Sequence, residues 1–315
     1  MRPKILFPDQ NKWIELAREK SLWSSAQRHA CIFDQLVRYV QEGKLLVPLT
    51  ASNIYETLKR NDPVSRSTLA FCQATLSGGL VIKNGTAQRR IQLREFFGRL
   101  GDRTATQPSS ENVISDFFPD AFADQEDLGL QEGDLETALA ISKMDPRIAL
   151  FSYMTQASNE HRKIAVENYS RSSQKMISEI NSRIQGLKSE PTGTRRRFYQ
   201  AILAYDHQDQ ILREADRHGI TKAKLTDKNG KLLRKVIREL DYFRIETELT
   251  LKIEGRNKKI AENELRDLQN ATTTIPICDL IVLEKDFSSL IEQCSIVQGS
   301  VPKITCSLSS LVDHI

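Results

Sequence analysis

Short apolar runs alternate with helical periodicities over the first hundred residues. Runs of three apolar residues, typical of short buried strands, predict strands at 5–7, 45–47 and 80–82. Apolar residues spaced for one helix face predict helices at about 12–20, 33–40, 53–60, 66–76 and 86–100. Because strands alternate with helices, we expect a parallel sheet covered by helices on both faces.

The same alternation returns at the end of the chain. A helix is predicted at about 244–270, which Gly255 could interrupt, followed by a strand at 280–283 and a helix at about 287–293. Weaker strand patterns follow at 295–297 and 304–306. Between about 101 and 245, helical patterns dominate and no strong strand pattern occurs. The sequence therefore predicts an α/β domain built from 1–100 and 246–315, divided by a mainly helical insertion at 101–245.

Charge is unevenly distributed along this insertion. The net charge of +4 is too small to indicate a nucleic-acid partner by itself. However, 105–142 contains no Lys or Arg, whereas 222–244 holds eight of them against three acids. Lys and Arg that contact phosphates give sequence-independent affinity for nucleic acid, although the basic stretch taken alone favours a solvated helix face. The candidate substrate-binding cations are Arg195, Arg196, Arg197, Lys231, Arg234, Lys235 and Arg238.

Other features narrow the class of protein. Five scattered cysteines without a Cys-x-x-Cys pair argue against a disulfide framework or a zinc site. The N-terminus lacks a signal-peptide pattern, and no apolar run approaches the roughly 20 residues of a membrane span. We therefore expect a soluble cytoplasmic protein.

Acidic residues recur near the ends of the predicted strands. Asp9 follows the first strand, and Glu56 lies in the helix after the second. The remaining candidates surround the late strand: Asp267, Asp279, Glu284 and Asp286. Ligands of open parallel sheets bind outside the carboxyl ends of the strands, and Mg²⁺ prefers oxygen ligands. Taken singly, each acid could instead be a helix cap or part of a charged helix face; taken together, they predict a site for Mg²⁺ or Mn²⁺.

Three segments resemble the PIN-domain superfamily of nucleases. They are 5–17, 52–57 and 267–287, which contain an Asp after the first strand, a Glu in an early helix and acids late in the chain. The resemblance implies a three-layer α/β/α domain with a parallel central sheet. It also implies divalent-metal-dependent cleavage of RNA, or less often DNA.

The resemblance assigns roles to individual residues. It implies that Asp9, Glu56, Asp267 and Asp279 are catalytic and bind the metal. Glu284 and Asp286 compete for the acid after the late strand, because the usual Thr-x-Asp is replaced there by Leu-Glu-Lys-Asp. Gln10 and Asn11 match an Asp-Gln-Asn variant of the opening motif, which implies contacts to the scissile phosphate or to the metal ligands.

Two alternatives to a constitutively active endoribonuclease remain open. The chain could be a catalytically inactive PIN-like module that binds a protein partner, or a second copy of itself, through the insertion. It could also be the restrained nuclease effector of a toxin or anti-phage system, in which a partner or the acidic segment masks the site.

Overall fold

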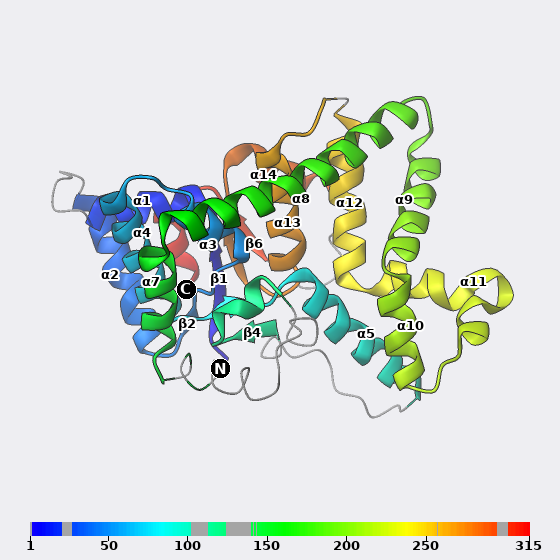
Figure 1. Ribbon diagram of the computed structural model, residues 1–315, viewed down its shortest axis with the longest axis horizontal. Helices are drawn as coiled ribbons and strands as arrows, with labels where there is room; N and C mark the ends of the chain where they lie inside the picture. Colours follow the sequence, from blue (N-terminus) through cyan, green and yellow to red (C-terminus); the bar gives the residue numbers. More distant parts are fainter. Residues whose placement is uncertain are drawn as a thin grey trace.

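A small parallel sheet lies near the centre of a mostly helical molecule (Figure 1). The computed structural model describes residues 2–20, 27–101, 113–123, 140, 142, 144–256, 258–294 and 302–315. The four-stranded sheet has the order β2–β1–β5–β6, and every neighbouring pair is parallel. Its strands are β2 (Leu45–Leu46), β1 (Lys4–Pro8), β5 (Leu280–Val282) and β6 (Lys303–Thr305). The predicted α/β class and parallel sheet are confirmed.

A third predicted strand, β3 (Val81–Ile82), lies beyond β2. Leu49 forms a parallel bridge with Val81, so the chain leaving β2 continues the sheet toward β3. On its other side β3 pairs antiparallel with β4 (Ile114–Ser115). The expectation of no strand between 101 and 245 was therefore wrong. Two residues are too few to show a period of two, so β4 is defined only by its pairing with β3.

The helices of the first hundred residues lie close to their predicted positions. They are α1 (Gln10–Lys20), α2 (Gln27–Gln41), α3 (Ala51–Leu58), α4 (Pro63–Ser77) and α5 (Gly85–Gly101). Local chemistry sets their ends. Thr50 and Asn53 form a capping box at the start of α3, and Asp62 caps α4. Gly78 ends α4 at φ 64°, a left-handed conformation that glycine adopts without a steric penalty.

Helices dominate the described part of 101–245 and continue beyond it. They are α7 (Pro146–Gln156), α8 (Asn159–Gly186), α9 (Thr192–Asp206), α10 (Gln208–Arg217), α11 (Lys222–Glu239), α12 (Asp241–Gly255), α13 (Glu262–Thr274) and α14 (Lys285–Glu292), with short 3₁₀ helices η2 (Phe118–Ala121) and η4 (Ser309–His314). The predicted helix at 244–270 is divided into α12 and α13, as Gly255 suggested. The strand predicted at 295–297 lies outside the described residues.

Alternate residues of β1 enter two different cores. Leu6 packs into a first core with α1, α2, α4 and α7, on the left of β1 in Figure 1. Ile5 and Phe7 pack into a second core with α8, α12, α13 and α14. A third core, away from the sheet, joins α5 to α9, α10, α11 and the start of α12. Helices from 101–245 thus contribute to all three cores, and the proposed domain boundaries stay a prediction.

No described helix has the length and apolar character needed to cross a membrane.

The central position of β1 gives a stability prediction. Phe7 has no exposed surface, so Phe7→Ala should lower the free energy of unfolding by about 3–5 kcal/mol through lost burial and a residual cavity. Phe198, which is 46% exposed on α9, supplies the matched control, and Phe198→Ala should change the stability by less than about 0.5 kcal/mol. Urea denaturation of both variants measures the difference. Equal effects would contradict the burial of Phe7.

Candidate functional site

Three carboxylates meet at the carboxyl end of β1 and β5. The backbone N–H of Asp9 donates to the carbonyl of Val282 at 2.8 Å, which places the end of β1 beside the end of β5. Glu284 follows β5 by two residues, and Asp267 comes from α13. The charges of Asp9 and Glu284 both act on Asp267, and the charge of Glu284 acts on Asp9; we call Asp9, Asp267 and Glu284 the acidic cluster.

Burial and mutual repulsion raise the pKa values of two members of the acidic cluster. Burial raises the pKa of Asp9, and the charge of Glu284 adds to this effect. The backbone N–H of Gln10 opposes it by donating to Asp9 Oδ1 at 2.7 Å. Burial followed by the charges of Asp9 and Glu284 raises the pKa of Asp267 to about 7. Like charges brought together out of water favour the protonated form, so the acidic cluster can hold a proton near neutral pH.

Asp9 and the nearby Asn11 also have structural roles at this site. Asp9 directly precedes α1, and its carbonyl accepts the first N–H bonds of that helix, from Lys12 at 2.9 Å and Trp13 at 3.1 Å. The backbone carbonyl of Asp9 thus caps the start of α1, whereas its carboxylate accepts the backbone N–H of Gln10. Asn11 is exposed and donates its side-chain N–H to Glu284 Oε1. Asn11 therefore orients a member of the acidic cluster.

Glu56 is bound by a cation that the sequence analysis did not consider. Arg266 of α13 forms an ion pair with Glu56, and its side chain is only 10% exposed. Burial lowers the pKa of Arg266, whereas Asp267 and Asp9 oppose that shift, so the guanidinium lies within the field of the acidic cluster. Glu56 is not the capping-box partner of Asn53, because Thr50 takes that role. In the sequence, the position of Arg266 directly before the candidate ligand Asp267 could have indicated that Arg266 lies at the site.

Asp279 lies at the opposite end of the sheet. Its Oδ2 accepts the backbone N–H of Ile5 at 2.9 Å, and its Oδ1 accepts from Arg2 at 2.7 Å. Asp9 follows Ile5 by four residues, which corresponds to roughly 13 Å along an extended strand. The structure therefore places Asp279 at the start of β5 as a clamp on β1, apart from the acidic cluster.

The two acids after β5 differ in their surroundings. Glu284 occupies the N-cap position of α14 and contributes to the raised pKa values of Asp9 and Asp267. Both side chains are exposed, but Asp286, in the first turn of α14, is not among the groups that shift those pKa values. The geometry favours Glu284 over Asp286 as a member of the site.

Gln10 belongs to a buried polar network. Its Oε1 accepts from Asn53 Nδ2 at 3.1 Å and from Gln73 Nε2 at 3.4 Å, and its Nε2 donates to Thr57 Oγ1 at 3.4 Å. Asn53, Thr57 and Gln73 have no exposed surface. Because buried polar groups need partners, this network ties α1 to α3 and α4. Gln10 thereby fixes the backbone that carries Asp9, in place of the expected contact to a phosphate.

The chemistry of the donors suits a hard divalent cation. Three carboxylates and the Asn11 amide are oxygen-rich, and a cation would relieve the repulsion that raises the pKa of Asp267. The positions of these side chains suit a cation less well. In the part of the chain that the structure describes, no three His, Cys, Asp or Glu side chains are arranged to hold a metal ion. The acidic cluster therefore fits Mg²⁺ or Mn²⁺ in the kind of ligand, and the side chains would have to draw together to coordinate it.

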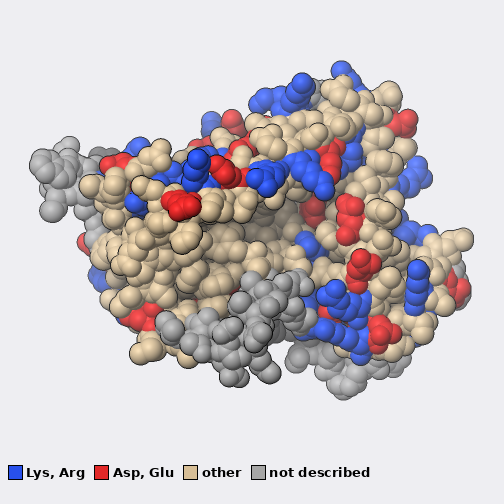
Figure 2. All heavy atoms as spheres, viewed as in Figure 1, with Lys and Arg blue, Asp and Glu red and all other residues tan. Residues whose placement is uncertain are grey.

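The candidate substrate-binding cations are dispersed over α9 and α11. Arg196 pairs with Glu248, with Nη2 and Oε2 3.0 Å apart, and Lys235 pairs with Glu239 at 3.8 Å. Arg195 donates to Thr192 Oγ1 at 3.4 Å, and Lys231 is exposed. On the face shown in Figure 2, Lys and Arg alternate with Asp and Glu along α8. The remaining three, Arg197, Arg234 and Arg238, line one cavity.

No protein-family model, curated protein or solved structure matches this chain.

The raised pKa of Asp267 gives a pH prediction. In the fold this carboxyl titrates near 7, against about 3.9 in the unfolded chain, so the folded state binds more protons between these values. Stability should therefore fall as the pH rises through that window when no divalent cation is present. After allowance for solvent screening we expect a loss of about 1–2 kcal/mol.

Denaturation at several pH values in the presence of a chelator measures this effect. Asp267→Asn should flatten the decline, because the amide does not titrate, whereas Asp286→Asn should retain the wild-type profile. Identical slopes for wild type and Asp267→Asn would show that Asp267 is not the titrating group.

Proposed function

We propose that the protein is a metal-dependent nuclease with a PIN-like α/β/α domain and a helical insertion, and that RNA is its preferred substrate. The observation that supports this proposal is the acidic cluster: burial, together with the charges of Asp9 and Glu284 from opposite ends of the chain, raises the pKa of Asp267 to about 7. The cluster lies at the carboxyl edge of a parallel sheet, where open α/β folds bind ligands. The position of Asp9 after the first strand and of the other acids late in the chain supports the likeness to PIN-type nucleases.

In this proposal Asp9, Asp267 and Glu284 hold Mg²⁺ or Mn²⁺. A bound divalent cation would supply a more acidic water and offset the negative charge of the phosphodiester. Glu56 would become a ligand only after Arg266 moved away, because the ion pair with Arg266 neutralises its charge. Asp279 and Asp286 are not needed as ligands, since both lie outside the acidic cluster.

The protein side chains would contribute charge and orientation. A bound cation would hold Asp267 in its carboxylate form, because it would offset the neighbouring charges that contribute to the raised pKa of Asp267. Asn11 would orient Glu284 through its hydrogen bond. Arg266, anchored on Glu56, places a positive charge beside the acidic cluster, where it would counter the approach of a phosphate to three carboxylates.

A second candidate function has its own support. In a catalytically inactive PIN-like interaction module, the Arg266–Glu56 ion pair would replace the metal as the source of positive charge. The lack of a metal-holding arrangement among the described residues favours this alternative. A restrained effector of a toxin or anti-phage system is a variant of the nuclease proposal, in which a rearrangement of Arg266 would accompany activation.

A cleavage assay tests the proposal. Wild type should cut labelled single-stranded RNA, and single-stranded DNA more slowly, with Mn²⁺ or Mg²⁺ and not with a chelator. Asp9→Asn and Asp267→Asn should each lower the rate on the order of 10²–10⁴-fold, because each removes a charged ligand of the cation. Asp286→Asn, an exposed acid outside the acidic cluster, should cleave at the wild-type rate.

Thermal melts should accompany each assay, so that a loss of activity is not mistaken for unfolding. Unchanged cleavage by Asp9→Asn would refute the site. No cleavage by wild type, combined with no heat of Mn²⁺ binding at millimolar ion, would support the inactive module.

A further inference from the structure

The helices α9, α10 and α11 enclose a cavity that has no part in the proposed nuclease site. Its volume is about 520 Å³, within the range of small-molecule sites. In Figure 1 these helices lie at the right-hand end of the molecule, beyond α12 and away from β1 and β5. The floor is aliphatic, formed by Ala201, Ala204, Ile211, Leu225, Leu233 and Ile237. We call this space the α9–α11 cavity.

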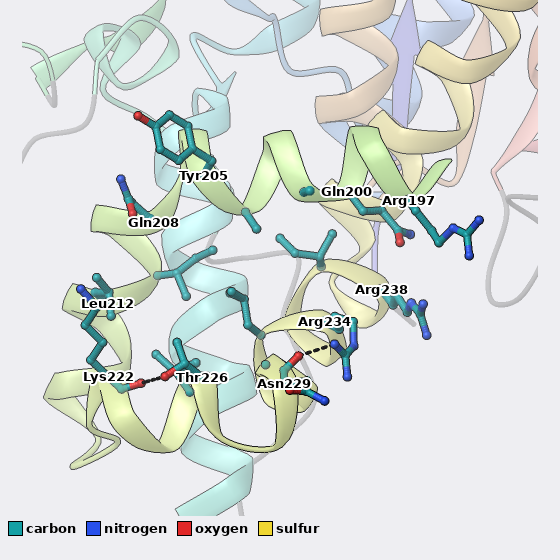
Figure 3. Close-up of a pocket in the computed structure, with 17 residues that line it drawn as sticks. Arg197, Gln200, Tyr205, Gln208, Leu212, Lys222, Thr226, Asn229, Arg234 and Arg238 are labelled. Atoms are coloured by element: carbon teal, nitrogen blue, oxygen red, sulfur yellow. Dashed lines mark hydrogen bonds between the residues drawn. The ribbon is translucent and has the colours of Figure 1, made fainter. Parts of the chain in front are cut away.

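Three arginines flank one end of the α9–α11 cavity. Arg197 comes from α9, and Arg234 and Arg238 are one turn apart on α11; Figure 3 shows all three at the same end. No Asp or Glu is among the described residues that line the cavity. Within the described residues, Arg197 donates to the hydroxyl of Thr194 at 3.5 Å, and Arg234 donates to the backbone carbonyl of Asn229. Their guanidinium groups therefore keep N–H donors and positive charge available to an anion.

A bend in α11 shapes the aliphatic part of the cavity. Asn229 and Gly230 have φ values of 60° and 71°, left-handed conformations inside a segment that is otherwise helical. Such residues interrupt the regular helix and change its direction. Leu225 before the bend and Leu233 after it both line the cavity as a result. The bend therefore brings apolar side chains from both halves of α11 to the same cavity.

We propose that the α9–α11 cavity binds an amphipathic anion that has an aliphatic body and one terminal anionic group. The anionic group would meet Arg197, Arg234 and Arg238, and the body would lie along α9 toward Tyr205. The path from Arg197 to Tyr205 covers eight residues, or roughly 12 Å at the helical rise. This length suits an alkyl or acyl chain.

An aliphatic body fits the lining better than a nucleobase does. Tyr205 is the sole aromatic residue among the described lining residues, and it is 72% exposed at the end opposite the arginines. Bases bound without sequence readout stack on aromatic side chains, and the floor offers only aliphatic ones. The three arginines thus meet an anionic group next to a space shaped for hydrocarbon.

Calorimetry with four probes below their micellar concentrations tests the inference. Dodecyl phosphate and dodecanoate each carry a head and a tail, dodecanol lacks the anion, and inorganic phosphate lacks the tail. Both amphipathic anions should bind at least about tenfold more tightly than either partial probe, because head and tail are recognised together. The ratio of their affinities distinguishes a phosphate from a carboxylate source.

Variants locate the binding. Replacing both arginines of α11, as Arg234→Gln with Arg238→Gln, should weaken dodecyl phosphate by at least about tenfold, because two charge-assisted donors are lost. Lys231→Gln, an exposed cation of the same helix outside the cavity, should leave the affinity unchanged. Ala204→Trp should block the aliphatic space and reduce binding of both anions, with circular dichroism confirming the fold.

Three results would overturn the inference. One is wild-type affinity in the double arginine variant, and another is inorganic phosphate binding as tightly as dodecyl phosphate. The third is displacement of dodecyl phosphate by short single-stranded RNA that binds more tightly through the same arginines, which would assign the cavity to nucleic acid. The first two results leave the nuclease assay unaffected, and the third would return the three arginines to the RNA-binding role predicted for them, so the two proposals fail separately.

Discussion

The parallel pairing of β1 with β5 is the constraint on which the remaining structure depends. Asp279 secures it from one end: its N–H donates to the carbonyl of Ile5 at 2.8 Å, and its Oδ2 accepts the N–H of Ile5, 274 residues away in the sequence. The Asp9–Val282 hydrogen bond closes the other end at 2.8 Å. The entropy of closing such a long loop grows only slowly with its length, so a few well-made contacts can hold the ends once the helices between them have packed. Asp9, which follows β1, and Glu284, which follows β5, come together in the acidic cluster only when this pairing has formed.

The long connection is held by helices that return to the sheet or to one another. Leu150 and Met154 of α7 are fully buried in the first core, and α8 supplies Ile177 and Ile180 to the second. In the third core Glu214 of α10 is 1% exposed and accepts from Arg94 of α5 at 2.8 Å. A buried carboxylate requires such a partner, because losing one member leaves an uncompensated charge. The middle of the chain is therefore joined to the β1–β5 region through apolar packing and a few satisfied ion pairs.

The sequence predicted features that depend on neighbours along the chain. Apolar runs located β1, β3 and β5, and the rule that ligands gather after parallel strands selected Asp9. The same rule could not show that Asp279 binds Ile5 and is not a metal ligand, because acids of both kinds lie beside a strand. Glu284 and Asp286 differ by two positions, which is within the uncertainty of where a helix begins. The amide network around Gln10 depends on α3 and α4 meeting α1, and no local pattern encodes that contact.

Arg266 shows why the acidic cluster must be considered as a balance of charges and not as a set of acids. Burial raises the pKa of Asp9 and of Asp267, the charge of Asp9 adds to the shift of Asp267, and Arg266 lowers the pKa of both. The same carboxylates oppose the fall in the pKa of the buried guanidinium, so the attraction is mutual. Arg266, which is shared with Glu56, and Lys12, which acts on Asp9, do not offset burial and the neighbouring carboxylates, so the pKa of Asp267 stays near 7. The residual negative potential is the physical reason to expect a cation at this edge of the sheet, and the position of Arg266 decides whether Glu56 can join it.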